Sequence, residues 1–546
     1  MPTAIVDGRE IQLAEGERLN GIELAARAGI EIPYYCWHPG LSVAGSWRMC
    51  LVETGMRDPK SGAISMLPKL VPACNTPVRD GTVLVTNSEK VARARAMVEE
   101  ELLLRHPIDC PICDKAGECR LQDYHFHYGQ GERRADIRPF TSRRRDVGHQ
   151  ITLFVDRCIL CSRCVRFCRE ISGTSELMVV RRGAHEEIDI LPDYPLANKL
   201  SGNVVDLCPV GALGDKEFLY RQRVWFMRSH PGMCTGCATG CATWVDENQD
   251  RVWRIRPREN PWVNKWWICN DGRYDYPHVH SDRRLASAKR REAGKLVDAD
   301  WTTLPGELDD KLRGAGRLAA VLSPFLTLEE AFMLAKYVRQ IDPESLLALG
   351  PIPVAGKDEH FPGGFTIAAE KCPNRRGVEE IVVRHTGRLL AFEGLLDEIE
   401  PAGVRGIWIS GGYKKDWIDE PTAMRFAGLE LVVVQDLFPS PLSDRATYVL
   451  PASAFPERDG SYVNRNDHLQ SVRWAIRPPA GVRPEGSLFW ELLGHSGLYD
   501  ARAVLSELAA EIGYFHVAGG TIPEVGVNLK VNLLATSTPG HPSATG

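Results

Sequence analysis

The residues of this chain best suited to chemistry are its cysteines. Fifteen of the sixteen lie between Cys36 and Cys269, and only Cys372 lies in the remaining half. The chain starts without the basic and apolar regions of a secretory signal, so we expect a reducing, cytosolic setting in which dense cysteines bind metals or catalyse reactions. Their spacing separates these uses.

The first group with metal-site spacing lies in a single short loop. It consists of His106, Cys110, Cys113 and Cys119. A loop of this length can wrap one metal centre. Zinc also accepts three cysteines and one histidine, so this group alone fits either zinc or an iron–sulfur cluster.

The second group has the repeat C-x2-C-x2-C, which presents three thiolates on successive backbone turns to a four-iron cluster. It comprises Cys158, Cys161 and Cys164. The fourth ligand is either Cys168, which completes the local run, or Cys208, which precedes a proline as the remote cysteine of ferredoxin-like sites often does. We favour Cys208.

The third group is a complete set of four thiols, Cys234, Cys237, Cys241 and Cys269. Four thiolates leave no open catalytic position, so the site is predicted to transfer electrons or to stabilise the fold. Soft thiolates select iron–sulfur clusters or zinc. Three such groups in one chain favour iron–sulfur, because a row of redox centres has a use that a row of zinc sites lacks.

A weaker set lies near the N-terminus, where Cys36, Cys50 and Cys74 do not complete a four-thiolate site. From composition alone, buried and inert cysteines are an equal alternative.

Motifs for binding a nucleotide are missing from the sequence. Neither G-x-G-x-x-G after a strand nor G-x-x-x-x-G-K-[ST] occurs, so no fingerprint for a nicotinamide dinucleotide or a nucleoside triphosphate is present. A chain with several metal groups and no substrate motif is predicted to carry electrons between partner proteins.

The composition agrees with a multidomain globular protein. The 546 residues are 44% hydrophobic and 25% charged, with a net charge of -5, which argues against disorder and against a chain-wide nucleic-acid surface. The arginine-rich stretch 122–150 is interpreted as a solvated surface or a subunit-contact loop. No apolar run approaches the ~18 residues that span a membrane.

Periodicity predicts a small sheet with one helix, followed by a longer helix that separates the first cysteine set from the next. The expected elements are a hairpin of strands 3–6 and 10–13, and helices at 19–28 and 88–104. We expect a domain boundary near residue 90.

After Cys269 the pattern changes to alternating strands and helices, which predicts an α/β fold with a parallel sheet. Thr327 and Glu330 have capping-box spacing at the start of one helix. The expected strands are 318–322, 346–349, 404–410 and 429–435, the helices 327–340 and 389–399, with a loop at 351–364 and a flexible tail at 535–546.

Together, the cysteine motifs resemble those of a known family. The motifs YYCWHPGLSVAGSWRMC, HPIDCPICDKAGEC, CILCSRCVRFCREI and CTGCATGC are similar to those of the large iron–sulfur subunit of the peripheral arm of bacterial respiratory complex I. The resemblance covers nearly the whole chain. It implies an electron-transfer subunit that relays electrons from the NADH- and flavin-binding subunit toward quinone, coupled in the whole complex to proton translocation.

The resemblance implies three [4Fe-4S] clusters and one [2Fe-2S] cluster, with no substrate-binding catalytic residue on this chain. The [4Fe-4S] ligands would be His106, Cys110, Cys113 and Cys119; Cys158, Cys161, Cys164 and Cys208; and Cys234, Cys237, Cys241 and Cys269. The last cluster occurs in only some bacterial members and is thought to lie off the main electron path. Cys168 and Cys372 receive no role.

The [2Fe-2S] motif departs from the family pattern. Cys36, Cys50 and Cys74 match it, but Trp47 stands where the family has a second cysteine. Indole does not ligate iron. We expect a retained cluster in which Ser46 or another oxygen is the substitute ligand; the alternative is a labile or absent cluster.

The second half resembles the molybdopterin oxidoreductases, through the segment from Val432 to Gln470, although His468 stands where arginine is usual. It is shorter than a complete catalytic domain, with the shortfall between residues 349 and 389, so we expect a degenerate domain without molybdopterin.

These interpretations give a multidomain chain, α+β and then α/β. The predicted domains are a β-grasp [2Fe-2S] ferredoxin-like domain (1–90), a [4Fe-4S] domain with one histidine and three cysteine ligands (91–145), a ferredoxin-like [4Fe-4S] domain (146–222), a [4Fe-4S] domain of molybdopterin-oxidoreductase type (223–280), a shortened molybdopterin-oxidoreductase-like α/β domain with a parallel sheet (281–535) and the tail (536–546).

The partners implied by the resemblance are the flavin- and NADH-binding subunit, a small [2Fe-2S] subunit and quinone-side iron–sulfur subunits. No nucleic acid is expected, and the membrane is contacted only through the complex, on its cytoplasmic side. The alternatives are the iron–sulfur subunit of an NAD-linked hydrogenase, a molybdopterin-dependent enzyme such as a formate dehydrogenase, and a zinc-stabilised scaffold.

Overall fold

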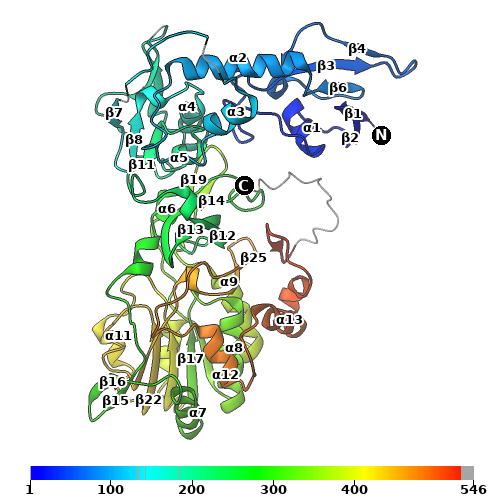
Figure 1. Cartoon of the computed structure of the whole chain (residues 1–546). Helices are drawn as coiled ribbons and strands as arrows, with labels where there is room; N and C mark the ends of the chain where they lie inside the picture. The colour runs from blue at the N-terminus through cyan, green and yellow to red at the C-terminus, as the bar shows by residue number, and fades with distance from the viewer. Residues whose placement is uncertain (1, 132–133, 142, 184, 531–546) are drawn as a thin grey trace. The chain divides into compact units, whose positions relative to one another are not determined.

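The computed structural model describes residues 2–131, 134–141, 143–183 and 185–530. These residues form two compact units, one of residues 2–226 with 361–364 and one of residues 227–360 with 365–530, which are described separately (Figure 1). The tail predicted at 535–546 lies outside the described residues. None of the helices in the described ranges combines the length and apolar character that a membrane span requires.

The first unit begins with a mixed sheet and one short helix. The strands, in spatial order, are β2 (Arg9–Gln12), β1 (Thr3–Val6), β6 (Thr82–Val85), β3 (Leu51–Arg57) and β4 (Ile64–Met66), with β5 (Val71–Pro72) paired to β3. Helix α1 (Gly21–Arg27) begins at Asn20, which forms a capping box with Glu23. Ile22 and Leu24 of this helix are buried in the core that includes Cys50 and Cys74. The predicted hairpin and helix are confirmed, each within two residues.

Two helices and two small sheets complete the first unit. Helix α2 (Glu89–Arg105), predicted within one residue, begins at Ser88, whose side chain accepts a hydrogen bond from the Val91 amide. The further elements are α3 (Arg120–Tyr128), α4 (Arg163–Phe167) and α5 (Asn203–Leu207), the sheet β11 (Leu213–Asp215), β8 (Ile151–Phe154), β7 (Arg144–Asp146), and the pair β9 (Leu177–Val180) and β10 (Glu187–Ile190).

The arginine-rich stretch is more ordered than a solvated loop. Arg143 forms ion pairs with Asp156 and Glu187, and Arg145 with Glu187 and Asp189. These arginines anchor strand β7 to the neighbouring sheets, because the nearly buried carboxylate of Glu187 requires positive partners. The sequence could not indicate this, since the acidic partners lie more than ten residues away along the chain. Arg133 lies outside the described residues.

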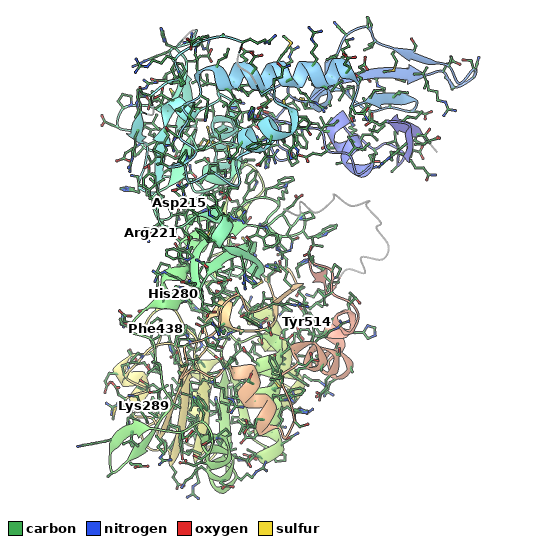
Figure 2. The ribbon with its side chains drawn as sticks, viewed as in Figure 1. Asp215, Arg221, His280, Lys289, Phe438 and Tyr514 are labelled. Carbon is green, nitrogen blue, oxygen red and sulfur yellow. The ribbon has the colours of Figure 1, made fainter. Side chains whose placement is uncertain are left out.

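The second unit begins with an antiparallel sheet of β12 (Arg228–Met233), β13 (Ala242–Asn248) and β14 (Arg251–Pro257), followed by α6 (Asn270–Arg273). Val245, Val252 and Ile268 are buried in one apolar cluster of this region, against which Phe438 packs. His280 Nε2 accepts a hydrogen bond from the Val252 amide at 3.0 Å, which ties the segment after α6 to β14; His280 and Phe438 are labelled in Figure 2.

The rest of the second unit is an α/β layer structure. Its sheet has, in the described part of the chain, the order β16 (Lys295–Asp298), β15 (Lys289–Glu292), β23 (Tyr448–Pro451), β22 (Leu431–Asp436), β21 (Gly406–Ser410), β17 (Leu318–Leu322), β18 (Leu346–Leu349). Strands β23 to β18 pair in parallel, which confirms the predicted parallel sheet, and only β15 and β16 are antiparallel.

Helices cover this sheet. They are α7 (Leu304–Gly314), α8 (Leu328–Ile341), α9 (Arg375–Thr386), α10 (Phe392–Glu398), α11 (Glu420–Met424), α12 (Glu485–Leu492) and α13 (Ala501–Glu511). The capping box of Thr327 and Glu330 is present at the start of α8. The short strands β19 (Glu359–His360), β20 (Thr366–Ile367), β24 (Gly460–Val463), β25 (His468–Val472) and β26 (Val527–Asn528) form two further sheets.

Two features of this layer were missed. Helix α9 was not predicted, because its β-branched run Ile381–Val383 and its glycine at position 377 obscure a helical period. The loop expected at 351–364 contains strand β19, which pairs with β20 across a tight turn.

Helix α8 buries a carboxylate that, among the described residues, has no counter-ion of its own. Glu329 is 1% exposed, and its Oε2 accepts a hydrogen bond from the Ser461 amide at 2.7 Å. Burial raises the pKa of Glu329 to about 7. The folded chain therefore retains a proton that the unfolded chain releases between about pH 4.5 and 7, so this group favours folding at low pH and loses that contribution as the pH rises.

We expect E329Q to change the pH dependence of stability. Relative to the native chain, E329Q should gain stability between pH 5 and 8, by about 2 to 3 kcal/mol, since each pH unit of a full one-proton difference is worth about 1.4 kcal/mol. Denaturant unfolding of both chains at several pH values measures this, with exposed Glu430 (E430Q) as the control. An E329Q effect that is the same at pH 5 and pH 8 would contradict the assignment.

Candidate metal centres

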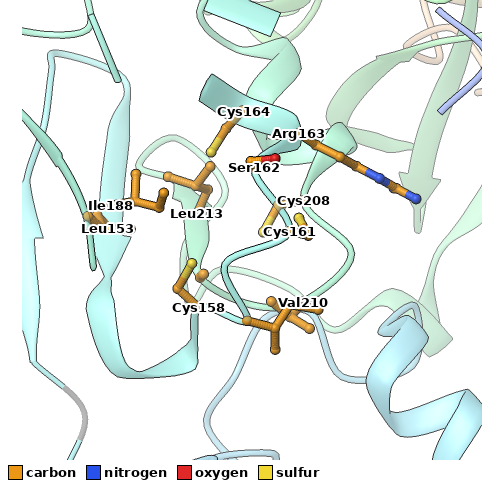
Figure 3. Close-up of a pocket in the computed structure, with 12 residues that line it drawn as sticks. Leu153, Cys158, Cys161, Ser162, Arg163, Cys164, Ile188, Cys208, Val210 and Leu213 are labelled. Atoms are coloured by element: carbon orange, nitrogen blue, oxygen red, sulfur yellow. The ribbon is translucent and has the colours of Figure 1, made fainter. Parts of the chain in front are cut away.

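Four cysteines of the first unit surround one pocket. Cys158, Cys161, Cys164 and Cys208 line it, and the remaining lining is mainly apolar, from Leu153, Ile159, Ile188, Val210, Ala212 and Leu213. Figure 3 shows the four thiols facing a common space from two separate loops, while the side chain of Arg163 extends away from it. The structure therefore brings together the three local cysteines and the distant Cys208.

The loop before α4 presents these thiols through an unusual backbone. Leu160 and Ser162 adopt positive φ angles of 54° and 57°, which turn the chain tightly between successive cysteines. The Leu160 amide donates a hydrogen bond to Cys158 Sγ at 3.3 Å. Burial raises the pKa of Cys161 to about 11, and it raises the pKa values of Cys158 and Cys164 further, with a contribution from the neighbouring thiols. These thiols would lose their protons only to a compensating cation.

Cys168 is not among the residues that line this pocket. It lies in the π-helical turn Cys168–Ser172, where burial and the neighbouring Glu176 carboxylate raise the pKa of its thiol to about 12. Its side chain is hydrogen-bonded with Glu176. The geometry therefore favours Cys208 over Cys168 as the fourth member of the group.

The His106 group occupies the loop between α2 and α3. His106 ends α2, and Cys119 immediately precedes α3. Burial and the nearby Arg157 lower the pKa of His106 to about 4, which keeps the imidazole neutral and able to bind a metal. Cys113 interacts electrostatically with both Cys110 and Cys119, and burial raises the pKa of Cys119 to about 11. The three thiols thus lie near one another, and Cys110 is exposed.

The N-terminal cysteines also converge. Cys36, Cys50 and Cys74 are buried, and a hydrogen bond from the Cys74 thiol lowers the pKa of Cys50 to about 7. Cys74 also interacts electrostatically with Cys36. Trp47 is partly buried, and its Nε1 is a buried donor without an acceptor among the described residues, while Ser46 is exposed. Three thiols are therefore present for a cluster that needs four ligands.

The fourth group belongs to the second unit. Cys234, Cys237, Cys241 and Cys269 line a pocket together with Gly236, Asp271, Gly272, Phe365, Thr366, Ile367 and Lys371. Cys234 and Cys241 flank the turn between β12 and β13, and the Cys234 amide donates to the Cys241 carbonyl at 2.8 Å. A Cβ at position 272 would lie 2.8 Å from Cys234 Sγ, so glycine is required for the close approach.

Backbone amides also donate hydrogen bonds to sulfur at this site. The Gly236 amide lies 3.4 Å from Cys234 Sγ, and the Gly272 amide lies 3.3 Å from Cys269 Sγ. Such bonds stabilise thiolates and tune the potentials of iron–sulfur centres. Burial raises the pKa values of Cys234, Cys241 and Cys269, so this site too requires a cation to ionise its thiols.

The arrangement of the thiols differs from that of a single-ion site. Around one zinc ion, with Zn–S bonds of about 2.3 Å, four sulfurs lie within about 4 Å of one another. Within the described ranges, no set of three or more His, Cys, Asp or Glu side chains forms a site for a single metal ion. The two four-thiol groups instead surround pockets, which suits a cluster that brings its own iron and sulfide atoms.

The edge of the parallel sheet where α/β proteins bind ligands is filled by the protein itself. Asp436 ends β22 and accepts hydrogen bonds from the Gly412 amide and from Trp417 Nε1. Tyr413 stacks on Trp417 with ring centroids 4.6 Å apart, and its hydroxyl donates to the Pro351 carbonyl at 2.8 Å. These residues do not fit a bound pterin at this edge.

Comparisons with known proteins place iron–sulfur domains along the first unit. The matching family models are the 2Fe-2S iron-sulfur cluster binding domain (3–89), the NADH-ubiquinone oxidoreductase-G iron-sulfur binding region (95–134), the NADH-quinone oxidoreductase subunit 3, ferredoxin-like domain (148–214) and, in the second unit, Molybdopterin oxidoreductase (391–494). The Cys234 group lies outside these matched ranges.

Two solved structures show limited likeness. An NAD+-reducing [NiFe]-hydrogenase in the H2-reduced state is 28% identical with a TM-score of 0.34, covering 41% of this chain and 91% of that chain. Acetylene hydratase from Pelobacter acetylenicus is 10% identical with a TM-score of 0.35, covering 48% of this chain and 69% of that chain.

Curated relatives carry one name. A protein from Rickettsia felis is 35% identical over 338 residues, or 62% of this chain and 48% of the relative, and one from Streptomyces coelicolor is 34% identical over 343 residues, or 62% and 39%. The chain thus spans about half the length of the curated relatives it matches or less. It is a homologue of the proteins named as the G subunit of NADH-quinone oxidoreductase and carries their iron–sulfur binding domains.

Proposed function

We propose that this chain is an iron–sulfur electron-transfer subunit of respiratory complex I, NADH:quinone oxidoreductase. The observation that carries the proposal is the pocket of Cys158, Cys161, Cys164 and Cys208, in which four thiols converge in apolar surroundings. Iron–sulfur clusters, when bound, accept and release single electrons without bond chemistry on a substrate. The homologues' common name supports the complex in which this relay takes place.

The proposed ligands follow the groups described above. Three [4Fe-4S] clusters would be held by His106, Cys110, Cys113 and Cys119; by Cys158, Cys161, Cys164 and Cys208; and by Cys234, Cys237, Cys241 and Cys269. A [2Fe-2S] cluster would be held by Cys36, Cys50 and Cys74 with an oxygen ligand such as Ser46. We assign no pterin to the second unit, since Tyr413 and Trp417 fill the sheet edge.

Contacts within the first unit support an order for the relay. Arg166 donates to the carbonyls of Cys36 and Cys161, which joins the N-terminal group to the Cys158 group. The Arg120 amide, next to Cys119, donates to the Pro209 carbonyl, next to Cys208, at 3.0 Å. The Cys158 group therefore lies between the other two, although it comes last of the three in the sequence.

The proposed role in the cell follows from the family. Electrons would enter from a flavin- and NADH-binding subunit and leave toward quinone-side iron–sulfur subunits, and a small [2Fe-2S] subunit would be a further partner. The complex as a whole would couple this transfer to proton translocation. The chain would reside on the cytoplasmic side of the plasma membrane and contact the membrane only through the complex.

A pair of matched variants tests the proposal at its central site. C208A should lose about four iron atoms per chain and the corresponding electron in a reductive titration followed by electron paramagnetic resonance, because a four-iron cluster needs its fourth ligand. C168A removes an equally buried cysteine and should retain both. Iron loss in C168A with full retention in C208A would exchange the two assignments, and a native chain without any iron–sulfur signal would exclude the function.

A glycine next to this site tests the contact between the Cys158 and His106 groups. A Cβ at position 211 would collide with Cys113 Sγ, which must then move. We expect G211A to lose iron selectively from the His106 group while the chain stays folded. G306A, with no neighbouring atom within 4 Å of the added methyl, is the control. Unchanged iron content and unchanged spectra in G211A would argue against ligation by Cys113.

The N-terminal site is tested by substitutions at positions 46 and 47. The native chain should show a [2Fe-2S] signal; S46A should weaken it, W47F should preserve it, and W47C should increase the fraction of chains with a cluster by supplying a fourth thiolate. Anaerobic purification and electron paramagnetic resonance of the reduced chains measure these signals. Complete absence of the signal from the native chain would show that the site is not assembled.

A further inference from the structure

We propose that Arg166 is a positioning residue that fixes the Cys36 and Cys158 groups relative to each other and raises the reduction potential of the centre held by the Cys158 group. This inference rests on the proposed function. It concerns a residue of helix α4 that is not itself a ligand.

The hydrogen bonds of Arg166 reach both groups at once. Its Nη2 donates to the Cys36 carbonyl and, at 3.3 Å, to the Cys161 carbonyl, and its Nη1 donates to the Ser42 carbonyl. Cys36 and Cys161 are themselves proposed ligands, one from each site. A single planar guanidinium therefore sets the spacing between two ligand backbones that are far apart in the sequence.

Arg163 repeats this pattern one helical turn earlier. Its Nη2 donates to the Trp37 carbonyl at 2.6 Å, and its Nη1 donates to the Leu207 carbonyl at 3.1 Å. Trp37 follows Cys36, and Leu207 precedes Cys208. The three-residue spacing puts both arginines on one face of α4, so this short helix joins the N-terminal loop to both halves of the Cys158 group.

Both arginines are buried without a bonded carboxylate among the described residues. Arg163 is 3% exposed and Arg166 is 4% exposed, and their hydrogen-bond acceptors there are backbone carbonyls and the Ser162 hydroxyl. A buried guanidinium ordinarily needs a negative partner. Arg163 Nε is moreover a buried donor that finds no acceptor within the described part of the chain.

The groups that face these charges are the cysteines. Arg166 interacts electrostatically with Cys161, Cys36, Glu170 and Cys164, and Arg163 interacts with Cys161. Glu170 is engaged by the Ser42 amide and hydroxyl, and also by Arg169. Thiolates at Cys161 and Cys164 would therefore supply the negative charge that the buried arginines lack. An added electron is stabilised by the same positive charge, which raises the potential.

By contrast, the arginine beside the His106 group has a carboxylate partner. Arg157 Nε donates to Asp109 Oδ2 at 2.8 Å, so its charge is largely balanced. The uncompensated positive charge thus belongs to the junction between the Cys36 and Cys158 groups.

Two substitutions at position 166 separate charge from bridging. R166Q removes the charge, and the midpoint potential of the Cys158-group centre should fall, by about tenfold in the redox equilibrium, or about 59 mV for one electron. R166K retains the charge and should leave that potential near the native value, while its single ammonium cannot span the three carbonyls. In both variants, amides of residues 36–42 should exchange hydrogen faster than in the native chain.

The experiment uses the full chain purified anaerobically, with redox titration followed by electron paramagnetic resonance and hydrogen exchange followed by mass spectrometry. R181Q, which removes an arginine that is 63% exposed and pairs with Glu187, is the control and should match the native chain in both readouts. If R166Q does not retain iron, R163Q replaces it as the charge variant with the same expectation.

The outcomes distinguish this inference from the proposed function. A native potential in the charge variant, or native exchange of residues 36–42 in R166K, would overturn the inference while the clusters and the relay remain. A native chain without iron–sulfur signals would instead exclude the proposed function on which the inference rests.

Discussion

A thiol in an apolar pocket keeps its proton unless a cation replaces it, and this constraint governs the candidate centres. Burial raises the pKa of Cys161 to about 11 and that of Cys164 further. Four such thiols around one pocket are a costly arrangement for the bare chain, because neighbouring thiolates repel one another. The cost is offset when a metal cluster occupies the pocket, so metal binding and folding of these loops are expected to be coupled.

The second unit solves a similar problem with its own side chains. Arg458 donates to Glu330 at 2.9 Å and to Glu485 at 3.0 Å, all three being nearly inaccessible to solvent. These bonds join α8 and α12 to the segment that follows β23. Buried ion pairs contribute little net stability compared with apolar packing, but breaking one leaves an uncompensated charge. The network therefore fixes how the helices pack, and it agrees with a scaffold whose sheet edge is filled by Tyr413 and Trp417.

Local patterns made much of this structure predictable. The strand Leu318–Leu322, the capping box of Thr327 and Glu330, and the cysteine spacings depend on residues close in sequence, and local physical rules cover them. Helix α9 was missed because β-branched residues and a glycine weaken its helical signal. The contact of Arg166 with Cys36 joins positions 130 residues apart, and only the tertiary fold brings them together. The choice between Cys208 and Cys168 likewise depended on which thiol faces the pocket.

The most direct test of this account is elemental analysis of the anaerobically purified chain for iron, acid-labile sulfide, zinc and molybdenum. Three four-iron clusters, with or without a two-iron cluster, predict about 12 to 14 iron atoms and a similar amount of sulfide per chain, without molybdenum. Zinc in place of iron would contradict the electron relay in favour of a structural scaffold, and stoichiometric molybdenum would contradict it in favour of a catalytic subunit.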